Sequence, residues 1–564
     1  MSGSQLVVFL FLLLLPIVAA MAWWLKRRYS TAIVRLQNEA LLAGTAQADS
    51  ATIPESGPIV APQTVPKLPL RIVPAQEIPY LFDSLHGTSA HRRLRRRVLS
   101  VQFWSGLLYW CALWLFVAGV FADAYGGLAQ VFAVLAFIGP APLLALLVPP
   151  SVAWVLEAGV NRTLMNAAAA LVLVSALGLL LSEEGWQSTL GFSLGYASIA
   201  LLVSAFLRPS IRGAGLPLIT AGLVGWLVLT GILAFVLALE TPSDDAAMSM
   251  TEVAVGVIML LLILVTAFWC GWRTLMQLAV KYQAKRFSDI QLALASYWAL
   301  LTGFVLGSVL RDPVLLVFYR LTPERVCVLA IVLWLLWRQA QSLALRSAVR
   351  GAAPSIGALL FLRVFKPSRR SEEFTDRFFA YWRFAAPVWM IAGPDLTGAY
   401  LEPNEFFAYL RGHLREHFIS DPVEATSRVK ALDNARDPDG RFRINELLCA
   451  NSTWQPAVLE MIAHAGVILL DLREYSQQRK GTRFELTELL RRAPLNRVLL
   501  LIDAKDDVVR FTAEVESIWQ EVGGYRSDIA DLGHLHVLRF SKGSNAEMHG
   551  LFRAAVHAAT SRNG

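Results

Sequence analysis

GVILLDLREYSQQRKGTRFELTELLRRAPLNRVLLLID (residues 466–503) contains two short runs of aliphatic residues separated by an amphipathic stretch. The runs, 466–472 and 497–503, have the length and composition of strands that are buried on both faces. Residues 484–492 between them repeat their apolar positions with helical spacing. A strand, a helix and a second strand in this order predict a parallel βαβ unit.

The same alternation extends on both sides of this unit, from Pro354 to the end of the chain. Further strands are expected at 357–365, 387–392 and 535–540, and further helices at 372–383, 405–418, 455–465, 508–522 and 546–559. This pattern predicts a doubly wound, mostly parallel sheet, which binds ligands at the carboxyl ends of its strands. The candidate cofactor-binding residues there are Arg363, Gly393, Asp395 and Asp471, although Gly and Asp also suit turns that bind nothing.

The composition of the whole chain indicates a membrane protein. Of its 564 residues 55% are hydrophobic and 17% charged, and the mean hydropathy is +0.49, well above the average of soluble proteins. The net charge of +8 comes largely from Arg and Lys at the ends of apolar runs, which favours membrane topology over nucleic-acid binding. Four scattered cysteines provide neither a disulfide framework nor a metal-binding CxxC pair.

Nine apolar runs are long enough, or nearly so, to cross a bilayer as helices. They are 6–25, 101–121, 128–147, 164–181, 189–207, 216–239, 253–272, 290–310 and 326–336. The first ends in Lys26, Arg27 and Arg28, so we expect an uncleaved anchor with an outside N-terminus and, after nine spans, a cytoplasmic C-terminus. The basic loop 311–325 disagrees with this threading, which leaves the number of spans open by one or two.

These observations predict four parts of the chain. They are an anchor at 1–28, a cytoplasmic Pro-rich linker with a basic cluster at 29–99, a polytopic transmembrane domain at 100–345 and the α/β domain at 355–564. We expect the basic cluster, His91 to Arg97, to contact lipid headgroups. No charged residue lies at the centre of a predicted span, which argues against a proton-coupled transporter.

The α/β domain also carries motifs of a known family. LRVF (362–365), VWMIAGPD (388–395), Trp454 before a helix that leads into GVILLDL, and FELTELL (484–490) resemble the bacterial membrane proteins with TIR-like cytoplasmic domains. The resemblance covers about 357–503 and departs from the family at Phe484, where a Trp is usual, and in a charged insertion at 419–443.

The resemblance implies a catalytic role for Glu485. In catalytic TIR domains a Glu at this place contacts the ribose of NAD, where a carboxylate stabilises the positive charge that develops as the glycosidic bond breaks. The alternative is a surface Glu in the first turn of a helix, where the helix dipole favours it. NAD is therefore a candidate substrate, and many domains of this kind only form scaffolds.

Other motifs give weaker signals. His413, Glu416 and His417 match the H-x-x-E-H spelling of zinc peptidases, but they fall in an ordinary amphipathic pattern and no metal site is predicted. His534 and His536 alternate on an expected strand and are interpreted as solvent-facing residues of an edge. No P-loop, GxGxxG or GxSxG motif occurs.

We therefore expect a signalling or defence-type protein of the bacterial inner membrane. Its cytoplasmic TIR-like domain would self-associate, bind a nucleotide or cleave NAD; its partners would be the lipid bilayer, further copies of the chain and a nucleotide ligand. The alternative is a non-enzymatic channel, transporter or envelope-assembly component whose cytoplasmic domain recruits partners.

Overall fold

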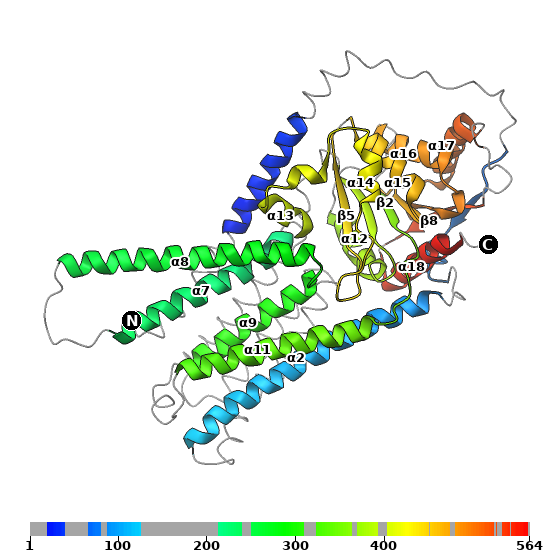
Figure 1. The fold of residues 1–564 in the computed structure, drawn as a ribbon. Helices are drawn as coiled ribbons and strands as arrows, with labels where there is room; N and C mark the ends of the chain where they lie inside the picture. Colours follow the sequence, from blue (N-terminus) through cyan, green and yellow to red (C-terminus); the bar gives the residue numbers. More distant parts are fainter. Residues whose placement is uncertain are drawn as a thin grey trace. The chain divides into compact units, whose positions relative to one another are not determined.

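The computed structural model describes residues 20–39, 66–80, 87–125, 212–239, 250–309, 323–363, 369–392, 403–450, 452–473, 480–523, 526, 533–541 and 543–561 (Figure 1). The chain divides into two compact units. The helical unit comprises Met1–Arg28, Val98–Ala348 and Leu401–Arg411, and the α/β unit comprises Tyr29–Arg97, Val349–Tyr400 and Gly412–Gly564.

The helical unit is built from long apolar helices. Besides the helical residues 20–28, its described elements are the C-terminal part of α2 (Gly87–Tyr125), α7 (Arg212–Leu239), α8 (Met250–Gln283), α9 (Asp289–Val309), α11 (Pro323–Val349) and the short α13 (Pro403–Leu410). Small residues bring α7 and α8 together, because a Cβ at Gly225 would stand 2.9 Å from the carbonyl oxygen of Ala267. Ordinary side chains would hold the two backbones apart.

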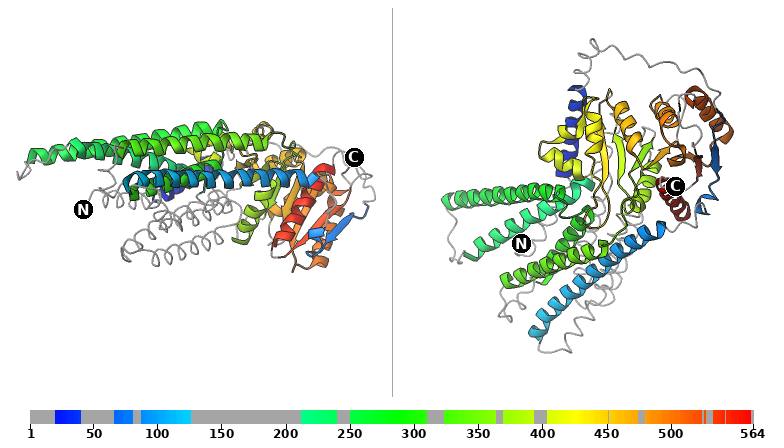
Figure 2. Two further views of the ribbon diagram at one scale, coloured as in Figure 1. Left: turned by 90° about the horizontal axis from the view of Figure 1, so that it is seen from below. Right: turned by 45° about the vertical axis from the view of Figure 1, so that its right-hand side comes forward.

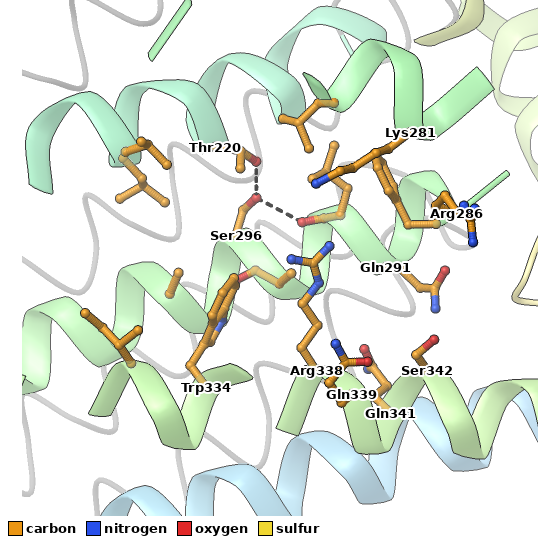
Figure 3. A pocket seen from close by; sticks show the side chains of 18 of the residues that line it. Thr220, Lys281, Arg286, Gln291, Ser296, Trp334, Arg338, Gln339, Gln341 and Ser342 are labelled. Atoms are coloured by element: carbon orange, nitrogen blue, oxygen red, sulfur yellow. Dashed lines mark hydrogen bonds between the residues drawn. The ribbon is translucent and has the colours of Figure 1, made fainter. Parts of the chain in front are cut away.

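Hydrogen bonds from polar side chains connect further pairs of helices. Thr220 of α7 and Ser296 of α9 share a hydrogen bond of 2.6 Å (Figure 3). Tyr109 of α2 binds Thr302 of α9 at 2.6 Å. The indole of Trp337 on α11 donates to a backbone carbonyl of α2, and these two helices run side by side in Figure 1.

Two described helix segments are long and apolar enough to cross a membrane, Ala254–Gln283 and Val328–Val349. Many apolar side chains of α8 are exposed, among them Val255, Leu262, Val265 and Phe268. The predicted spans 128–147, 164–181 and 189–207, and all of 6–25 before residue 20, lie outside the described residues. Helix 20–39 extends well beyond the predicted end of the anchor.

One expectation about the membrane helices is wrong. The predicted span 326–336 is only part of α11, whose apolar segment continues to Val349 because Gln and Arg among many Leu and Ala do not interrupt a helix. Arg338 therefore lies in the middle of a candidate span. The argument against coupled transport that rested on the absence of such residues no longer holds for this helix.

The α/β unit is built on an eight-stranded parallel sheet with the order β1-β8-β7-β6-β2-β3-β5-β4. The five predicted strands are confirmed as β2 (Leu359–Arg363), β3 (Val388–Ala392), β6 (Val467–Asp471), β7 (Val498–Asp503) and β8 (Leu535–Phe540). The others are β1 (Leu70–Val73), β4 (Phe418–Ile419) and β5 (Ile444–Cys449).

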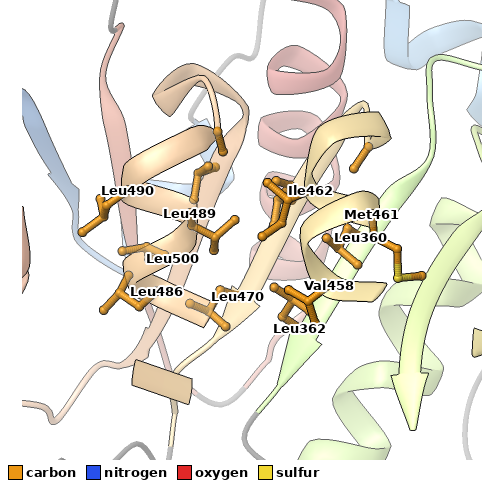
Figure 4. Packing of buried hydrophobic residues seen from close by; sticks show 14 of the residues in the cluster. Leu360, Leu362, Val458, Met461, Ile462, Leu470, Leu486, Leu489, Leu490 and Leu500 are labelled. Carbon is orange, nitrogen blue, oxygen red and sulfur yellow. The ribbon is translucent and has the colours of Figure 1, made fainter. Parts of the chain in front are cut away.

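Helices cover both faces of this sheet. One face packs on α14 (Glu424–Lys430), α15 (Trp454–His464), α16 (Lys480–Arg492) and α17 (Val508–Val522). The other packs on α12 (Arg369–Trp382), α18 (Asn545–Thr560) and the short η1 (Ile78–Tyr80). Figure 4 shows the first core, in which Leu486 and Leu489 of α16 meet Leu470 and Leu500 of the sheet.

The segment interpreted as a linker takes part in this sheet. β1 pairs in parallel with β8, and Figure 2 shows it in blue at the edge of the sheet. The carbonyl of Ile78 occupies the space where Gly550 of α18 has no side chain. Residues 66–80 are therefore a packed part of the α/β unit, because the Leu70–Val73 run finds its partner at the far end of the sequence.

The basic cluster also packs on the α/β unit. His91 and Leu94, in the first turns of α2, are buried. The guanidinium of Arg95 stacks 4.3 Å from the ring centre of Tyr381 on α12, an ordinary cation–π arrangement. At least these side chains of the cluster contact protein in this structure.

Candidate ligand site at the carboxyl edge of the sheet

The order of the strands defines where a ligand is expected to bind. From β2 the chain proceeds to β3, then to β4 at the edge and back to β5, all on one side, and afterwards to β6, β7 and β8 on the other. The direction of winding therefore reverses between β2 and β6. In open parallel sheets, ligands bind in the crevice outside the carboxyl ends at such a switch point.

Two of the predicted site residues meet at this point. Arg363 ends β2, Asp471 ends β6, and the two stand opposite each other in the register of the paired strands. Both side chains are buried, with 5% and 4% of their surface exposed. Their strands alternate faces, which places both side chains on the α12 and α18 side of the sheet.

Arg473 completes this group and was not among the predicted site residues. Its Nε and Nη2 donate to the two carboxylate oxygens of Asp471 at 2.8 and 2.7 Å. The guanidinium lies 4.1 Å from the ring centre of Phe374. The available signal was its position two residues beyond Asp471, which places both side chains on the same side of an extended chain.

Glu485 is buried on the sheet-facing side of α16. It shares that side with Thr482, Leu486 and Leu489, at the spacing of successive helical turns. Only 2% of its surface is exposed, so the alternative of a surface Glu is wrong. Its apolar neighbours explain the burial, because a residue next to Leu486 on a helix that packs by this stripe turns toward the sheet.

The carboxyl of Glu485 lacks a full set of polar partners. Its Oε2 and the Oγ1 of Thr482 are buried and form no hydrogen bond with the described residues. Burial raises the pKa of Glu485 from its ordinary 4.5 to about 8. A pKa raised to this extent favours the neutral acid over the carboxylate at pH 7.

The structure does not gather all predicted residues on one face. α16 packs on the face opposite to α12 and α18, so Glu485 comes from the opposite layer to Arg363 and Asp471. Gly393 and Asp395 lie outside the described residues. Phe484, which stands where the TIR-like family has Trp, packs edge-to-face on Trp454, with the two ring centres 5.2 Å apart.

The histidine motifs differ in part from their predicted settings, although His534 is solvent-exposed as expected. The helix expected at 405–418 ends at Leu410, because Gly412 adopts a positive φ of 76°, and a 3-10 turn, η2 (Leu414–His417), follows. His413 there contacts Glu416 at 2.6 Å. His536 is buried and β8 is not an edge strand, because β1 covers it; burial first, and then Arg71, lowers its pKa to about 4.

Comparison with known proteins adds no relative. No protein-family model, curated protein or solved structure matches this chain significantly. The likeness to TIR-like domains therefore rests on sequence motifs alone.

Proposed function

We propose that this chain is a membrane-anchored signalling protein whose α/β unit binds a nucleotide at the carboxyl edge between β2 and β6, with NAD as the substrate. The observation that carries the proposal is the reversal of strand order, with Arg363, Asp471 and Arg473 buried at that point. Guanidinium groups suit phosphates because they offer paired donors in a fixed plane.

The crevice of such a sheet lies between the helices that follow the two strands at the switch point. Here these are α12 after β2 and α16 after β6, on opposite faces. A ligand in the crevice would therefore meet the arginine group from one face and the first turns of α16, with Thr482 and Glu485, from the other. Both helices direct backbone N–H groups toward that space, which suits a pyrophosphate.

Glu485 supplies the chemistry of the proposal. Hydrolysis of NAD adds water across the bond between the ribose and nicotinamide, and the ribose carbon becomes positively charged as that bond breaks. A carboxylate is needed to stabilise this charge. The positively charged nicotinamide ring would favour loss of the proton from Glu485, because an opposite charge nearby lowers the pKa of a carboxyl group.

A covalent route supports a role in signalling across the two units. After β3 the chain contributes α13 to the helical unit and returns to the α/β unit at Gly412. Phe407 of α13 packs on Tyr282 of α8 with ring centres 5.4 Å apart, and Arg411 donates a hydrogen bond to Gln283. We infer that a change at the end of β3 reaches the helical unit through this segment.

The proposed location is the bacterial inner membrane, with several spans and a cytoplasmic α/β unit. Two described helices of sufficient length and apolarity support it, as does the charge of the loops. A reporter enzyme fused after Gly564 tests the orientation, and activity only in the periplasm would contradict it.

The enzymatic proposal is tested with the full chain in detergent, because residues 66–97 take part in the α/β unit. We expect release of nicotinamide from NAD, lost in Glu485→Gln, and weakened NAD binding in Arg363→Lys. Arg483→Ala is the matched control, since Arg483 lies on the same helix as Glu485 with an exposed side chain. Equal turnover by wild type and Glu485→Gln would remove Glu485 from the mechanism, and no NAD binding would remove the site.

A non-enzymatic channel or transporter is the second candidate, favoured by the position of Arg338 within a candidate span. Solute flux through proteoliposomes and NAD hydrolysis, measured on the same preparation, separate the two functions.

A further inference from the structure

The helical unit contains a large cavity between α7, α8, α9 and α11. Its volume is about 910 Å³, near the upper end of the range of small-molecule pockets. Polar side chains line part of it, among them Ser296 and Gln291 of α9, both labelled in Figure 3. The cavity lies entirely within the helical unit.

Positive charge is concentrated along this cavity. Lys281, Arg286, Arg338 and Arg346 line it, and none of the described lining residues is Asp or Glu. None of the four forms an ion pair with a carboxylate of the described residues. Arg338 stacks on Trp334 with its guanidinium 5.7 Å from the ring centre. Cations within membrane helices are costly without a partner, and such residues commonly mark binding sites.

The two ends of the cavity differ in polarity. Along α11, residues 331, 334, 338, 342 and 346 line it at successive helical turns, a length of about 22 Å at 1.5 Å per residue. The cations come from the last turn of α8 and the residues just after it (Lys281, Arg286) and from the second half of α11 (Arg338, Arg346), whereas Ile331, Ala330 and Val224 are apolar. The indole of Trp334 donates to the carbonyl of Ala295 and so joins α11 to α9 between the two ends.

We propose that this cavity binds a lipid with an anionic phosphate headgroup. The phosphate contacts Arg338 and Arg346 of α11 together with Lys281 and Arg286, and the hydrocarbon chain extends along α9 and α11 toward Ile331. Charge complementarity selects the headgroup, and the gradient from cationic to apolar lining selects an amphiphile over a free anion. The inference rests on the proposed membrane location but not on the nucleotide site.

Gly303 supplies a further observation for the tail. It lines the cavity on α9, and a Cβ placed there would meet no atom within 4 Å. Space is therefore open beside Gly303, at the apolar end of the cavity. A larger side chain at this position would enter the region assigned to the hydrocarbon chain without changing any charge.

The test measures binding to the purified full-length protein in detergent, without nucleotide, by native mass spectrometry and by the shift of the melting temperature. The probes are dioleoyl phosphatidic acid, dioleoyl glycerol, which lacks the phosphate, and inorganic phosphate, which lacks the chains. We expect phosphatidic acid to bind at least tenfold more tightly than either of the other two. Arg338→Gln and Gly303→Leu should each weaken it about tenfold.

Arg273→Gln is the matched control. Arg273 lies on α8, stacks on Trp269 and does not line the cavity. It should bind phosphatidic acid as wild type does. Equal binding of dioleoyl glycerol, equal binding of inorganic phosphate with no effect of Gly303→Leu, or an equal loss in Arg273→Gln would each overturn the proposal. Recovery of the chain from the soluble fraction without detergent would overturn both the membrane location and this site.

Discussion

The two units differ in how their charged side chains are placed and paired. In the α/β unit, three buried arginines face carboxylates at close range: Arg441 lies 2.7 Å from Asp439, Arg443 lies 2.9 Å from Asp437, and Arg473 lies 2.7 Å from Asp471. In the helical unit, the four cations that line the cavity are solvent-exposed, and they form no ion pair with the described residues. A folded domain must neutralise the charges that it buries, whereas water can solvate exposed cations that line an open cavity and a ligand can still bind them.

Glu485 of the α/β unit differs from these three carboxylates in having no arginine partner among the described residues. It is as buried as Asp471, yet no guanidinium pairs with it among the described residues. Burial therefore raises its pKa, which favours the protonated carboxyl. The two candidate sites of this chain thus share one physical feature, an ionisable group whose polar partner the described protein does not fully supply. Tests of stability can separate this feature from ordinary ion pairing.

The largest effect is expected from breaking a paired charge. Arg441→Ala leaves the side chain of Asp439, which has 0% of its surface exposed, as a buried carboxylate without its guanidinium partner. We expect the α/β unit to lose about 3–5 kcal/mol in its free energy of unfolding. Chemical unfolding of the full chain in detergent measures this loss. The double variant Asp439→Asn with Arg441→Ala should recover much of it, and no recovery would argue against the pair as the cause.

Glu485→Gln is expected to produce a smaller effect that depends on pH. The folded carboxyl, with a pKa of about 8, keeps its proton at pH values where the unfolded group, with a pKa of 4.5, has lost it. Wild-type stability contributed by this proton is therefore complete below pH 4.5 and is lost as the pH rises to 8. Because each pH unit corresponds to about 1.4 kcal/mol, the variant should gain about 3 kcal/mol relative to wild type between pH 5 and pH 8.

Unfolding measured at several pH values tests this expectation. Arg483→Ala, on the same helix, should follow the pH dependence of the wild type. A constant difference between wild type and Glu485→Gln across this range would mean that the carboxyl ionises normally in the folded protein, and that it is not buried as described.

The central strands could be predicted because their signal is local. Runs such as VILLD and VLLLID are apolar on both faces, and only a strand between two layers of helices buries both. β1 could not be found in this way, because LRIV is a short run among prolines and its partner, β8, is distant in the sequence. Gly412 was the missed signal for the end of α13.

The candidate site was predictable only at the strand ends. Arg363 and Asp471 followed from their positions after apolar runs, and register then brings them together. The burial of Glu485 depends on which side of α16 faces the sheet, which the Leu486 and Leu489 spacing indicates but a family motif does not. The cavity could not be predicted, because Lys281 and Arg338 belong to helices whose neighbours the sequence does not specify.

Arg338→Met should raise the free energy of unfolding, whereas Arg441→Ala should lower it. No carboxylate of the described residues pairs with Arg338, so its removal leaves no carboxylate unpaired. Met fills similar space beside Trp334. We expect lipid-free protein to gain about 1–2 kcal/mol, less than the roughly 2.5–3.5 kcal/mol by which Arg disfavours a helix centre in a bilayer, because the cavity is partly polar. Thermal unfolding followed by tryptophan fluorescence measures it, and a loss above about 2 kcal/mol would show that Arg338 has a structural partner.

The smallest effect is expected from an ion pair at the surface. Arg483 and Glu521 lie 3.3 Å apart, with 46% and 54% of their side chains exposed, so water screens their attraction and both side chains lose freedom to hold it. Arg483→Ala should change the free energy of unfolding by less than about 0.5 kcal/mol, and added salt should reduce even that difference. A loss comparable to that of Arg441→Ala would mean that distance alone, rather than burial, decides the strength of these pairs. The contrast between the two units would then no longer distinguish a structural charge from one that awaits a ligand.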